Sequence, residues 1–220
     1  MIIAIDGPAG SGKSTTAKLV AQRLGFIFLD TGAMYRAIAL KALQAGVQVE
    51  NAGAICKLAE IAELDLAYKN QQLYVFLDGQ DVTDAIRQPE VTAMVVAVAA
   101  IPGVRKTLRE KQRQLGYSQD AVVEGRDMGT VVFPDADLKI YLTASIEERA
   151  QRRYLQLEEK HIETDINELR QAIQQRDQQD ATRAEAPLKK AADAIELDTS
   201  NLSIEEQVTF ILEEFKRIKK

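Results

Sequence analysis

A glycine-rich segment near the start of the chain constrains its fold more than any other feature of the sequence. Residues 7–14 read Gly-Pro-Ala-Gly-Ser-Gly-Lys-Ser, which matches the pattern G-x-x-x-x-G-K-[ST]. An apolar run at 2–5 precedes the segment, and apolar residues at helical spacing follow it at 17–24. The pattern therefore predicts a strand, a tight loop and a helix in direct succession, which is the context of a phosphate-binding loop.

The chemistry of such a loop accounts for its residue types. Glycines allow consecutive backbone N–H groups to turn toward phosphates, and the following helix adds the partial positive charge of its N-terminus. We expect Lys13 to reach the β- and γ-phosphates and Ser14 to offer a hydroxyl to Mg²⁺. The alternative is a tight connection with no ligand, but the complete eight-residue pattern argues against it. The sequence thus predicts nucleotide binding.

Strands and helices alternate along most of the chain, which predicts the α/β class with a parallel sheet. Residues 64–68 and 73–77 differ, because they flank a polar segment and predict a β-hairpin. We interpret the insert around it, from about residue 52 to about residue 90, as a substrate-covering lobe. The other expected elements are strands at 26–29, 121–123, 138–142 and 194–197, helices at 34–45, 89–100, 104–115 and 167–178, and capping boxes at Ser145 with Glu148 and at Ser203 with Glu206.

The overall composition excludes several classes of protein. The 220 residues are 46% hydrophobic and 28% charged, and the net charge of −5 argues against a basic surface for nucleic acid. Cys56 is the only cysteine, so no intramolecular disulfide is possible and a reducing compartment fits best. The longest apolar run, 94–101, is shorter than the roughly 20 residues of a membrane helix, and no signal-peptide pattern occurs. We expect one cytoplasmic domain that binds neither nucleic acid nor membrane.

Further motifs separate the classes of nucleotide-binding protein. No N-K-x-D guanine-reading motif occurs, and no predicted strand ends in the D-x-x-G of a GTPase switch. Glu124 ends a predicted buried strand, where a carboxylate suits a Walker-B-like role that holds Mg²⁺ through water. An exposed charge at a strand end is the alternative for this residue.

The arginines of this acidic chain follow predicted strand ends or lie on mid-chain helices. Arginine clamps phosphate oxygens in bidentate fashion without losing its proton, so the set favours an anionic acceptor, although any one member could be solvated surface. Arg149 and Arg153 share one helix face, which predicts a lid that excludes water from the triphosphate; a salt-bridged helix surface is the alternative. The full set is Arg36, Arg105, Arg126, Arg149, Arg152, Arg153, Arg176 and Arg183.

Three segments together resemble bacterial cytidylate kinases. They are Ile5-Asp6-Gly7-Pro8 leading into the glycine-rich loop, residues 29–36 (Leu-Asp-Thr-Gly-Ala-Met-Tyr-Arg) and residues 125–136 (Gly-Arg-Asp-Met-Gly-Thr-Val-Val-Phe-Pro-Asp-Ala). Arg176-Asp177 with Asp180, Arg183 and 186–188 extends the likeness over nearly the whole chain. The resemblance implies one P-loop domain, 1–220, with the three-layer fold of nucleoside monophosphate (NMP) kinases. That fold has a central parallel sheet, a small α+β NMP-binding insert at 31–105 and a helical lid with its adjoining helix at 150–186.

The resemblance also implies an activity, the transfer of the γ-phosphoryl group of ATP to CMP or dCMP with Mg²⁺ as cofactor. Carried over residue by residue, the ATP site would consist of Gly7, Pro8, Ala9, Gly10, Ser11, Gly12, Lys13, Ser14 and Thr15, and the metal ligands would be Ser14 and, through water, Glu124. On the acceptor, Arg36, Arg126 and Arg183 would hold the phosphate, Thr31 would lie beside it, Arg105 and Asp127 would face cytosine, and Arg176 and Asp180 would hold the ribose. Lys13, Arg126, Arg149 and Arg153 would form the catalytic group.

The assignment of Arg105 and Asp127 agrees with the chemistry of cytosine. Its N4 amino donor lies next to the N3 and O2 acceptors, so it suits a carboxylate beside a guanidinium, whereas uracil reverses the pattern at C4 and N3. Two positions depart from the family pattern: Glu124 stands where Asp is frequent, and Val96 stands where many members have Ser. Both concern the tuning of the metal site and of base selectivity rather than the reaction class.

The expected mechanism is in-line phosphoryl transfer, in which the protein positions the reactants and neutralises charge. The acceptor phosphate is already anionic, so no general base is required. The nearest alternative is another small P-loop kinase acting on UMP, dTMP or a non-nucleotide acid. An alternative of a different class is a nucleotide-binding module that transfers no phosphate. No feature of the sequence indicates an interface, so we expect a monomer.

Overall fold

The chain forms two units, each with its own core, in a computed structural model that describes residues 1–69, 72–159 and 161–219. Unit 1 combines residues 1–26 with 121–220, and unit 2 is the continuous segment 27–120. Unit 1 therefore joins the glycine-rich loop at the N-terminus to elements more than a hundred residues later in the chain.

A parallel sheet forms the centre of unit 1. It contains β1 (Ile2–Asp6), β6 (Ala121–Gly125), β7 (Leu138–Thr143) and β8 (Ile195–Asp198) in the order β6-β1-β7-β8. Every residue of β1 and β6 is buried. Strands that are covered on both faces are almost continuously apolar, which agrees with the sequences of these two strands. β1 lies between β6 and β7, with Asp6 in register with Gly125 on one side and Tyr141 on the other. The predicted α/β class with a parallel sheet is confirmed.

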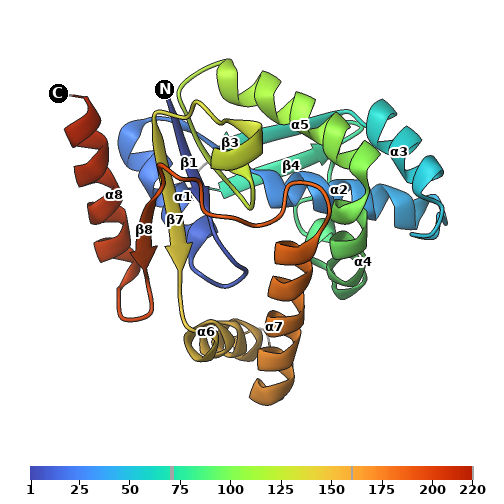
Figure 1. Cartoon of the computed structure of the whole chain (residues 1–220). Helices are drawn as coiled ribbons and strands as arrows, with labels where there is room; N and C mark the ends of the chain where they lie inside the picture. The colour runs from blue at the N-terminus through green and yellow to red at the C-terminus, as the bar shows by residue number, and fades with distance from the viewer. Residues whose placement is uncertain (70–71, 160, 220) are drawn as a thin grey trace. The chain divides into compact units, whose positions relative to one another are not determined.

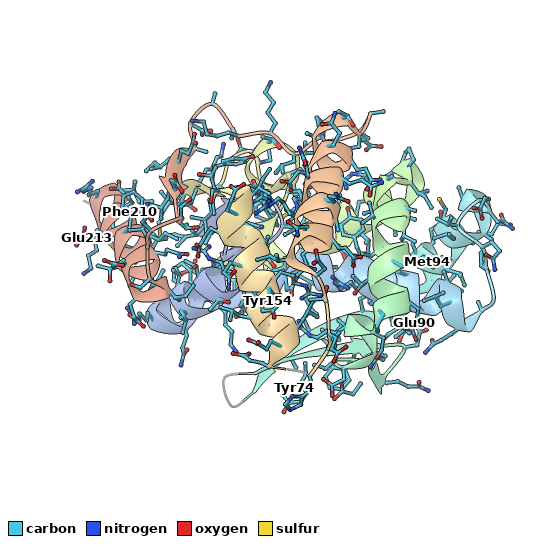
Figure 2. All side chains as sticks on the ribbon, turned by 90° about the horizontal axis from the view of Figure 1, so that it is seen from below. Tyr74, Glu90, Met94, Tyr154, Phe210 and Glu213 are labelled. Carbon is cyan, nitrogen blue, oxygen red and sulfur yellow. The ribbon has the colours of Figure 1, made fainter. Side chains whose placement is uncertain are left out.

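Helices α1 (Lys13–Leu24) and α8 (Ile204–Ile218) pack together on this sheet. Phe26 and Phe215 meet edge to face at 5.6 Å where these helices end, which is a favourable aromatic arrangement. Helices α6 (Ile146–Glu158) and α7 (Ile166–Thr182) lie against each other, as Figure 1 shows. Figure 2 labels Tyr154 on α6 and, on α8, Phe210 and the exposed Glu213. A short π-helical turn, η2 (Met128–Val132), completes unit 1.

Unit 2 is mainly helical, with a small antiparallel sheet. Its order is β2 (Ile27–Asp30), α2 (Thr31–Gln44), α3 (Ala52–Ile61), β3 (Leu64–Lys69), β4 (Gln72–Leu77), β5 (Gln80–Asp81), η1 (Ala85–Arg87), α4 (Pro89–Ala100) and α5 (Pro102–Tyr117). The predicted hairpin is confirmed as β3 and β4, with Leu64 opposite Leu77; residues 70 and 71 at its tip lie outside the described residues. Its core includes Met34, Ile38, Ile55, Val75, Ile86 and Val98.

The apolar run at 94–101 lies mostly in α4, where Val95 and Val98 are buried and Glu90 and Met94 are labelled in Figure 2. Within the described residues, no single helix is long and apolar enough to span a membrane. The pair α4 and α5, bent by 94°, meets that test of length and composition only when both helices are taken together.

Two local expectations need correction. The helix expected at 34–45 begins at Thr31, because the Asp30 side chain accepts a hydrogen bond from the Ala33 N–H at 2.9 Å and caps the helix earlier. Only half of the capping box expected at Ser145 forms: its hydroxyl accepts from the Glu148 N–H, but the Glu148 carboxylate binds Arg152 instead. The turn η2 was not foreseen from the sequence. The capping box of Ser203 and Glu206 is confirmed.

Candidate active site

The glycine-rich loop turns tightly between β1 and α1. Gly7 has φ of 149°, and a Cβ atom placed there would lie 2.1 Å from the Leu142 carbonyl oxygen. Gly12 has φ of 90° and is the N-cap residue of α1, but it has no side chain that could accept a hydrogen bond. The N–H groups of the first turn of α1 also have no partner within the helix. The loop is therefore close-packed against β7 and still offers free donors for an anion.

Lys13 begins α1, and its ammonium is directed back over the loop. Its Nζ donates to the Pro8 carbonyl at 2.6 Å and lies 3.4 Å from the Ser11 hydroxyl, and the residue is only 5% exposed. Burial, followed by the nearby positive charge of Arg126, lowers the pKa of Lys13 to about 7, although Glu124 opposes the shift. A bound phosphate would supply the missing negative charge, so this site is prepared for an anion.

Ser14 and Glu124 meet below the loop, where the Ser14 hydroxyl donates to Glu124 Oε1 at 2.7 Å. Mg²⁺ prefers oxygen donors and usually combines one or two protein ligands with substrate phosphates and water. The hydroxyl and the carboxylate fit this preference. The predicted Mg²⁺ site at Ser14 and Glu124 is therefore chemically consistent with the residues that the fold places together.

The residues assigned to the acceptor in unit 1 converge on one another. Arg126 Nε donates to Asp180 Oδ2 at 2.9 Å, Arg183 Nη2 donates to Asp127 Oδ1 at 3.4 Å, and Arg183 Nη1 lies 3.8 Å from Asp180 Oδ1. Burial works against the charge of Arg126, but Asp180 and Glu124 hold its pKa above the ordinary value. Arg176 on α7 also belongs here, since it is close enough to Lys13 to contribute to lowering its pKa.

The two predicted lid arginines occupy different environments. Arg149 is 4% exposed; its guanidinium donates to the Ala144 carbonyl at 3.0 Å and to the Ala9 carbonyl of the loop at 3.1 Å, and it pairs with Asp177 at 2.6 Å. Arg153 is exposed, and its guanidinium makes a long hydrogen bond to Gln156 at 3.4 Å. Arg149 thus connects α6 to the loop and to α7, whereas Arg153 faces solvent.

Three residues that support the loop region were not predicted as site residues from the sequence: Arg152, Thr199 and Gln207. The Thr199 hydroxyl donates to the Ser11 carbonyl at 3.1 Å, and Arg152 donates both to that hydroxyl, at 3.1 Å, and to the Thr199 carbonyl, at 2.6 Å. Buried Gln207 accepts from the Thr16 hydroxyl at 2.7 Å. No local pattern marks Thr199 or Gln207, because their partners lie far away in the sequence; Arg152 had been noted only as a member of the arginine set.

The other predicted acceptor residues lie in unit 2. Thr31 is buried at the first turn of α2, and Arg36 donates to the Thr92 hydroxyl at 2.8 Å and to the Ile86 carbonyl at 3.3 Å. Arg105 is 2% exposed and donates to the Ala99 carbonyl at 3.2 Å, with its guanidinium 5.6 Å from the centre of the Tyr35 ring. These residues are held firmly within unit 2, and their role toward the acceptor stays a prediction.

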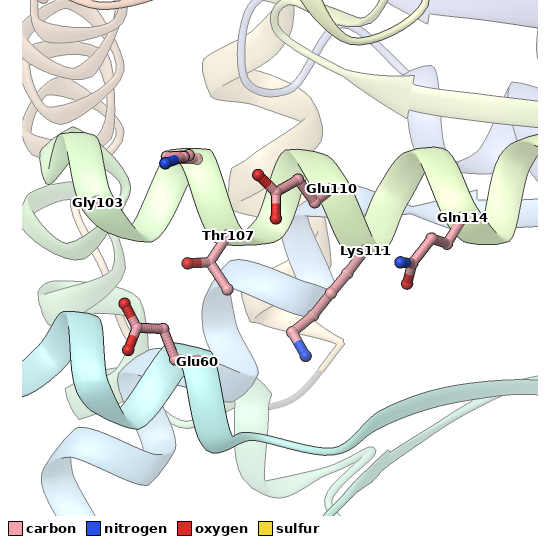
Figure 3. Close-up of a pocket in the computed structure, with 7 residues that line it drawn as sticks. Glu60, Gly103, Thr107, Glu110, Lys111 and Gln114 are labelled. Carbon is pink, nitrogen blue, oxygen red and sulfur yellow. The ribbon is translucent and has the colours of Figure 1, made fainter.

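A hollow of about 370 Å³ in unit 2 is separate from all of these residues (Figure 3). It lies between α3 and α5, and Glu60 and Lys111 extend into it. Glu110 and Lys106 also line it, so both signs of charge are present side by side. It contains none of the predicted site residues, and we assign no activity to it.

Asp6, the last residue of β1, accepts hydrogen bonds from the turn that follows Arg126 and Asp127. It is 5% exposed, and burial raises its pKa to about 6, although the Gly129 and Met128 N–H groups bonded to it oppose the shift. A carboxyl group whose pKa is higher in the folded state binds more protons there than in the unfolded state between about pH 4 and pH 6. Its contribution to stability therefore increases as the pH falls through 6.

This shift predicts a pH-dependent difference between the wild type and an Asp6→Asn variant. Lowering the pH from 7.5 to 5 should raise the free energy of unfolding of the wild type relative to the variant by about 1 kcal/mol. Urea titrations of both proteins at the two pH values measure this difference. A difference that does not change with pH would show that Asp6 titrates normally.

Comparison with known proteins identifies the family. The family model for cytidylate kinase matches residues 3–217. The chain belongs to the cytidylate kinase family. The cytidylate kinase of Shouchella clausii is 49% identical over 96% of this chain and 94% of its own length. The bifunctional pantoate ligase/cytidylate kinase of Synechococcus elongatus is 53% identical over 93% of this chain, which spans 40% of that protein's length.

One solved structure supports the fold alone. An uncharacterized protein from Eubacterium ventriosum is 11% identical, with a TM-score of 0.53 over 99% of this chain and 98% of its own.

Proposed function

We propose that this chain transfers the γ-phosphoryl group of ATP to CMP and dCMP, giving CDP and dCDP. The observation that carries the proposal is the closeness, in unit 1, of Lys13 to Arg126, whose charge helps to lower the pKa of the lysine, together with the Arg126–Asp180 and Arg183–Asp127 pairs. A nucleotide-binding module without an acceptor would not need a cluster of partly buried, ion-paired arginines of this kind. Membership of the cytidylate kinase family supports the cytidine acceptor.

On the donor side, residues 7–15 bind the phosphates of ATP through backbone N–H groups and the Lys13 ammonium. Mg²⁺, when bound, neutralises phosphate charge, and Ser14 and Glu124 are the residues that would hold it, Glu124 through water. Arg149 already contacts the loop through the Ala9 carbonyl, so a small change of partner would bring its guanidinium onto a phosphate oxygen. Arg153 is free to approach from solvent as the lid moves.

On the acceptor side, Arg126 and Arg183 bind the phosphate of CMP, Asp127 accepts from the cytosine N4 amino group, and Asp180 with Arg176 binds the ribose. The carboxylates that pair with these arginines hold the guanidinium groups in place before the substrate arrives, which reduces the cost of ordering them. By the same family pattern, Thr31, Arg36 and Arg105 of unit 2 are also assigned to the acceptor, an assignment that rests on the sequence resemblance. Residues 31–105 would then act as the NMP-binding lobe and residues 150–186 as the lid.

The chemical step requires positioning and charge neutralisation rather than a general base. The acceptor phosphate oxygen attacks in line with the leaving oxygen of ADP, and charge develops on the equatorial oxygens of the transferred group. We assign Lys13 and the arginines to the stabilisation of that charge, because preorganised cations act most strongly where a closed site excludes water. We also propose a cytoplasmic, monomeric enzyme without nucleic-acid or membrane partners.

A panel of acceptors tests the substrate. We expect CMP and dCMP to be phosphorylated at least tenfold more efficiently, in kcat/KM, than UMP or dTMP, because uracil and thymine leave polar groups of a cytosine site unpaired. ADP release is measured in a coupled assay with each monophosphate and with a non-nucleotide acid as acceptor. Equal rates with all acceptors would contradict the cytidine assignment, and an absence of acceptor-dependent ADP release would favour a non-catalytic module.

A further inference from the structure

Asp6 makes an unusual pair of contacts for a residue at the end of a strand. Its Oδ1 accepts from the Met128 N–H at 2.9 Å, and its Oδ2 accepts from the Gly129 N–H at 2.8 Å. The two donors are consecutive in the chain and are separated from Asp6 by more than a hundred residues. One carboxylate thereby clamps a backbone turn with both of its oxygens.

The clamped turn is the first turn of η2, where N–H groups have no partner within the helix. It follows directly after Arg126 and Asp127, whose side chains are assigned to the acceptor. The turn also packs closely on its support, since a Cβ atom at Gly129 would lie 3.1 Å from Lys139 Cδ and 3.5 Å from Asp6 Oδ2. The backbone that carries Arg126 and Asp127 therefore rests on Asp6.

The type of side chain matters at this position. A carboxylate offers acceptors on both oxygens, whereas an amide offers one acceptor and directs an NH₂ group at the second N–H donor. Burial disfavours the charged form of the Asp6 carboxylate, and a neutral side chain would not carry this desolvation cost. The carboxylate offsets the cost because it accepts from the Met128 and Gly129 N–H groups at the same time.

We propose that Asp6 is a positioning residue for the acceptor: it fixes the 128–129 turn and so sets the placement of Arg126 and Asp127, without itself touching the substrate. This inference rests on the proposed function for the identity of the acceptor. The contacts between Asp6 and the turn do not depend on that proposal. It differs from a general contribution to folding because its loss should affect the acceptor more than ATP.

The test compares Asp6→Asn with a matched variant, Asp137→Asn. Asp137 is exposed and accepts from the Ile2 N–H at the opposite end of the same strand β1, at 2.6 Å, so the control removes a carboxylate that also bonds to backbone. For Asp6→Asn we expect a KM for CMP raised about tenfold and a kcat lowered about tenfold, with the Kd for ATP within threefold of wild type. The Asp137→Asn variant should match the wild type in all three quantities.

Hydrogen exchange supplies a second readout. In Asp6→Asn, the amides of residues 127–132 should exchange at least tenfold faster than in wild type, while those of β1 and α1 stay protected. If Asp6→Asn does not fold, Asp6→Ser is measured in the same way, and in the wild type itself the Met128 and Gly129 amides should be protected although they begin a helix.

The outcomes separate the two proposals. Unchanged exchange at 127–132 together with an unchanged KM for CMP would overturn the role of Asp6, as would an equal loss of affinity for ATP and CMP. Unprotected Met128 and Gly129 amides in the wild type would also overturn it. If the wild type phosphorylates no monophosphate, the proposed function fails, whereas faster exchange of the turn in Asp6→Asn would still support the clamp.

Discussion

Replacing Lys13 with Met should lower kcat by about a thousandfold or more while leaving the protein at least as stable as the wild type at pH 7. The loss of activity follows from removal of the Lys13 ammonium over the loop, which would stabilise the charge of the transferred phosphoryl group. Stability behaves differently because burial lowers the pKa of Lys13 to about 7, so holding the charge in the folded protein is unfavourable.

The sign of this effect gives a second measurement. The unfolded state binds more protons at Lys13 than the folded state between about pH 7 and pH 10.5, so the contribution of this group to stability increases as the pH rises through that window. The stability advantage of Lys13→Met should therefore be largest at pH 7 and should shrink by pH 9. Urea titrations at both pH values measure it, and a coupled assay measures kcat.

A lysine on the surface of the same unit serves as the control. Lys190 pairs with Glu196 at 2.8 Å, and both side chains are largely solvated, so Lys190→Met should change neither kcat nor stability by much. A Lys13→Met enzyme that keeps more than a tenth of the wild-type kcat would exclude Lys13 from catalysis. A clear loss of stability at pH 7 would show that its charge is well compensated in the folded protein.

Replacing Arg126 with Ala should reduce kcat/KM for CMP by about a thousandfold and leave the Kd for ATP within threefold. Arg126 is one of two arginines in unit 1 that we assign to the acceptor phosphate, whose oxygen attacks in the chemical step, and an arginine on a reacting phosphate contributes on this scale. Its partner Asp180 keeps a second arginine, Arg183, at 3.8 Å, so the variant does not leave that carboxylate without a counter-charge.

Arg217→Ala is the matched control for this substitution. Arg217 is exposed on α8 and forms a surface ion pair with Glu214, which is typically worth little. Steady-state kinetics with varied CMP and calorimetry with a non-hydrolysable ATP analogue measure the two predicted quantities. Equal losses of ATP and CMP binding in Arg126→Ala would place Arg126 at the donor, and an unchanged kcat/KM would remove it from the site.

The Lys13 and Arg126 predictions are physically connected. The charge of Arg126 is the second-largest cause of the lowered pKa of Lys13, and Arg176 adds to it. Three cationic groups thus lie close enough to repel one another in the absence of substrate. Two phosphorylated reactants would relieve that repulsion. We therefore expect the favourable free energy of binding anions to exceed the free-energy cost of holding the cations close together.

The sequence by itself determined the local features of this protein. The glycine-rich loop, its strand and its helix follow from residue types at fixed spacing, and the hairpin of β3 and β4 and the start of α8 at Ser203 follow from alternation and capping. Where local expectations were wrong, a tertiary or neighbouring bond competed: Glu148 pairs with Arg152 rather than closing a capping box. The π-helical turn at Met128 likewise depends on a distant carboxylate.

Only the tertiary structure decided which distant residues support the site. Asp6 reaches Met128 across 122 positions, Arg149 reaches the Ala9 carbonyl across 140, and Thr16 reaches Gln207 across 191. Such bonds depend on how parallel strands and their connecting helices are brought together, and no periodicity or short motif encodes that arrangement. The sequence therefore predicted the groups that we assign to the phosphates, whereas the fold revealed the groups that hold them in place.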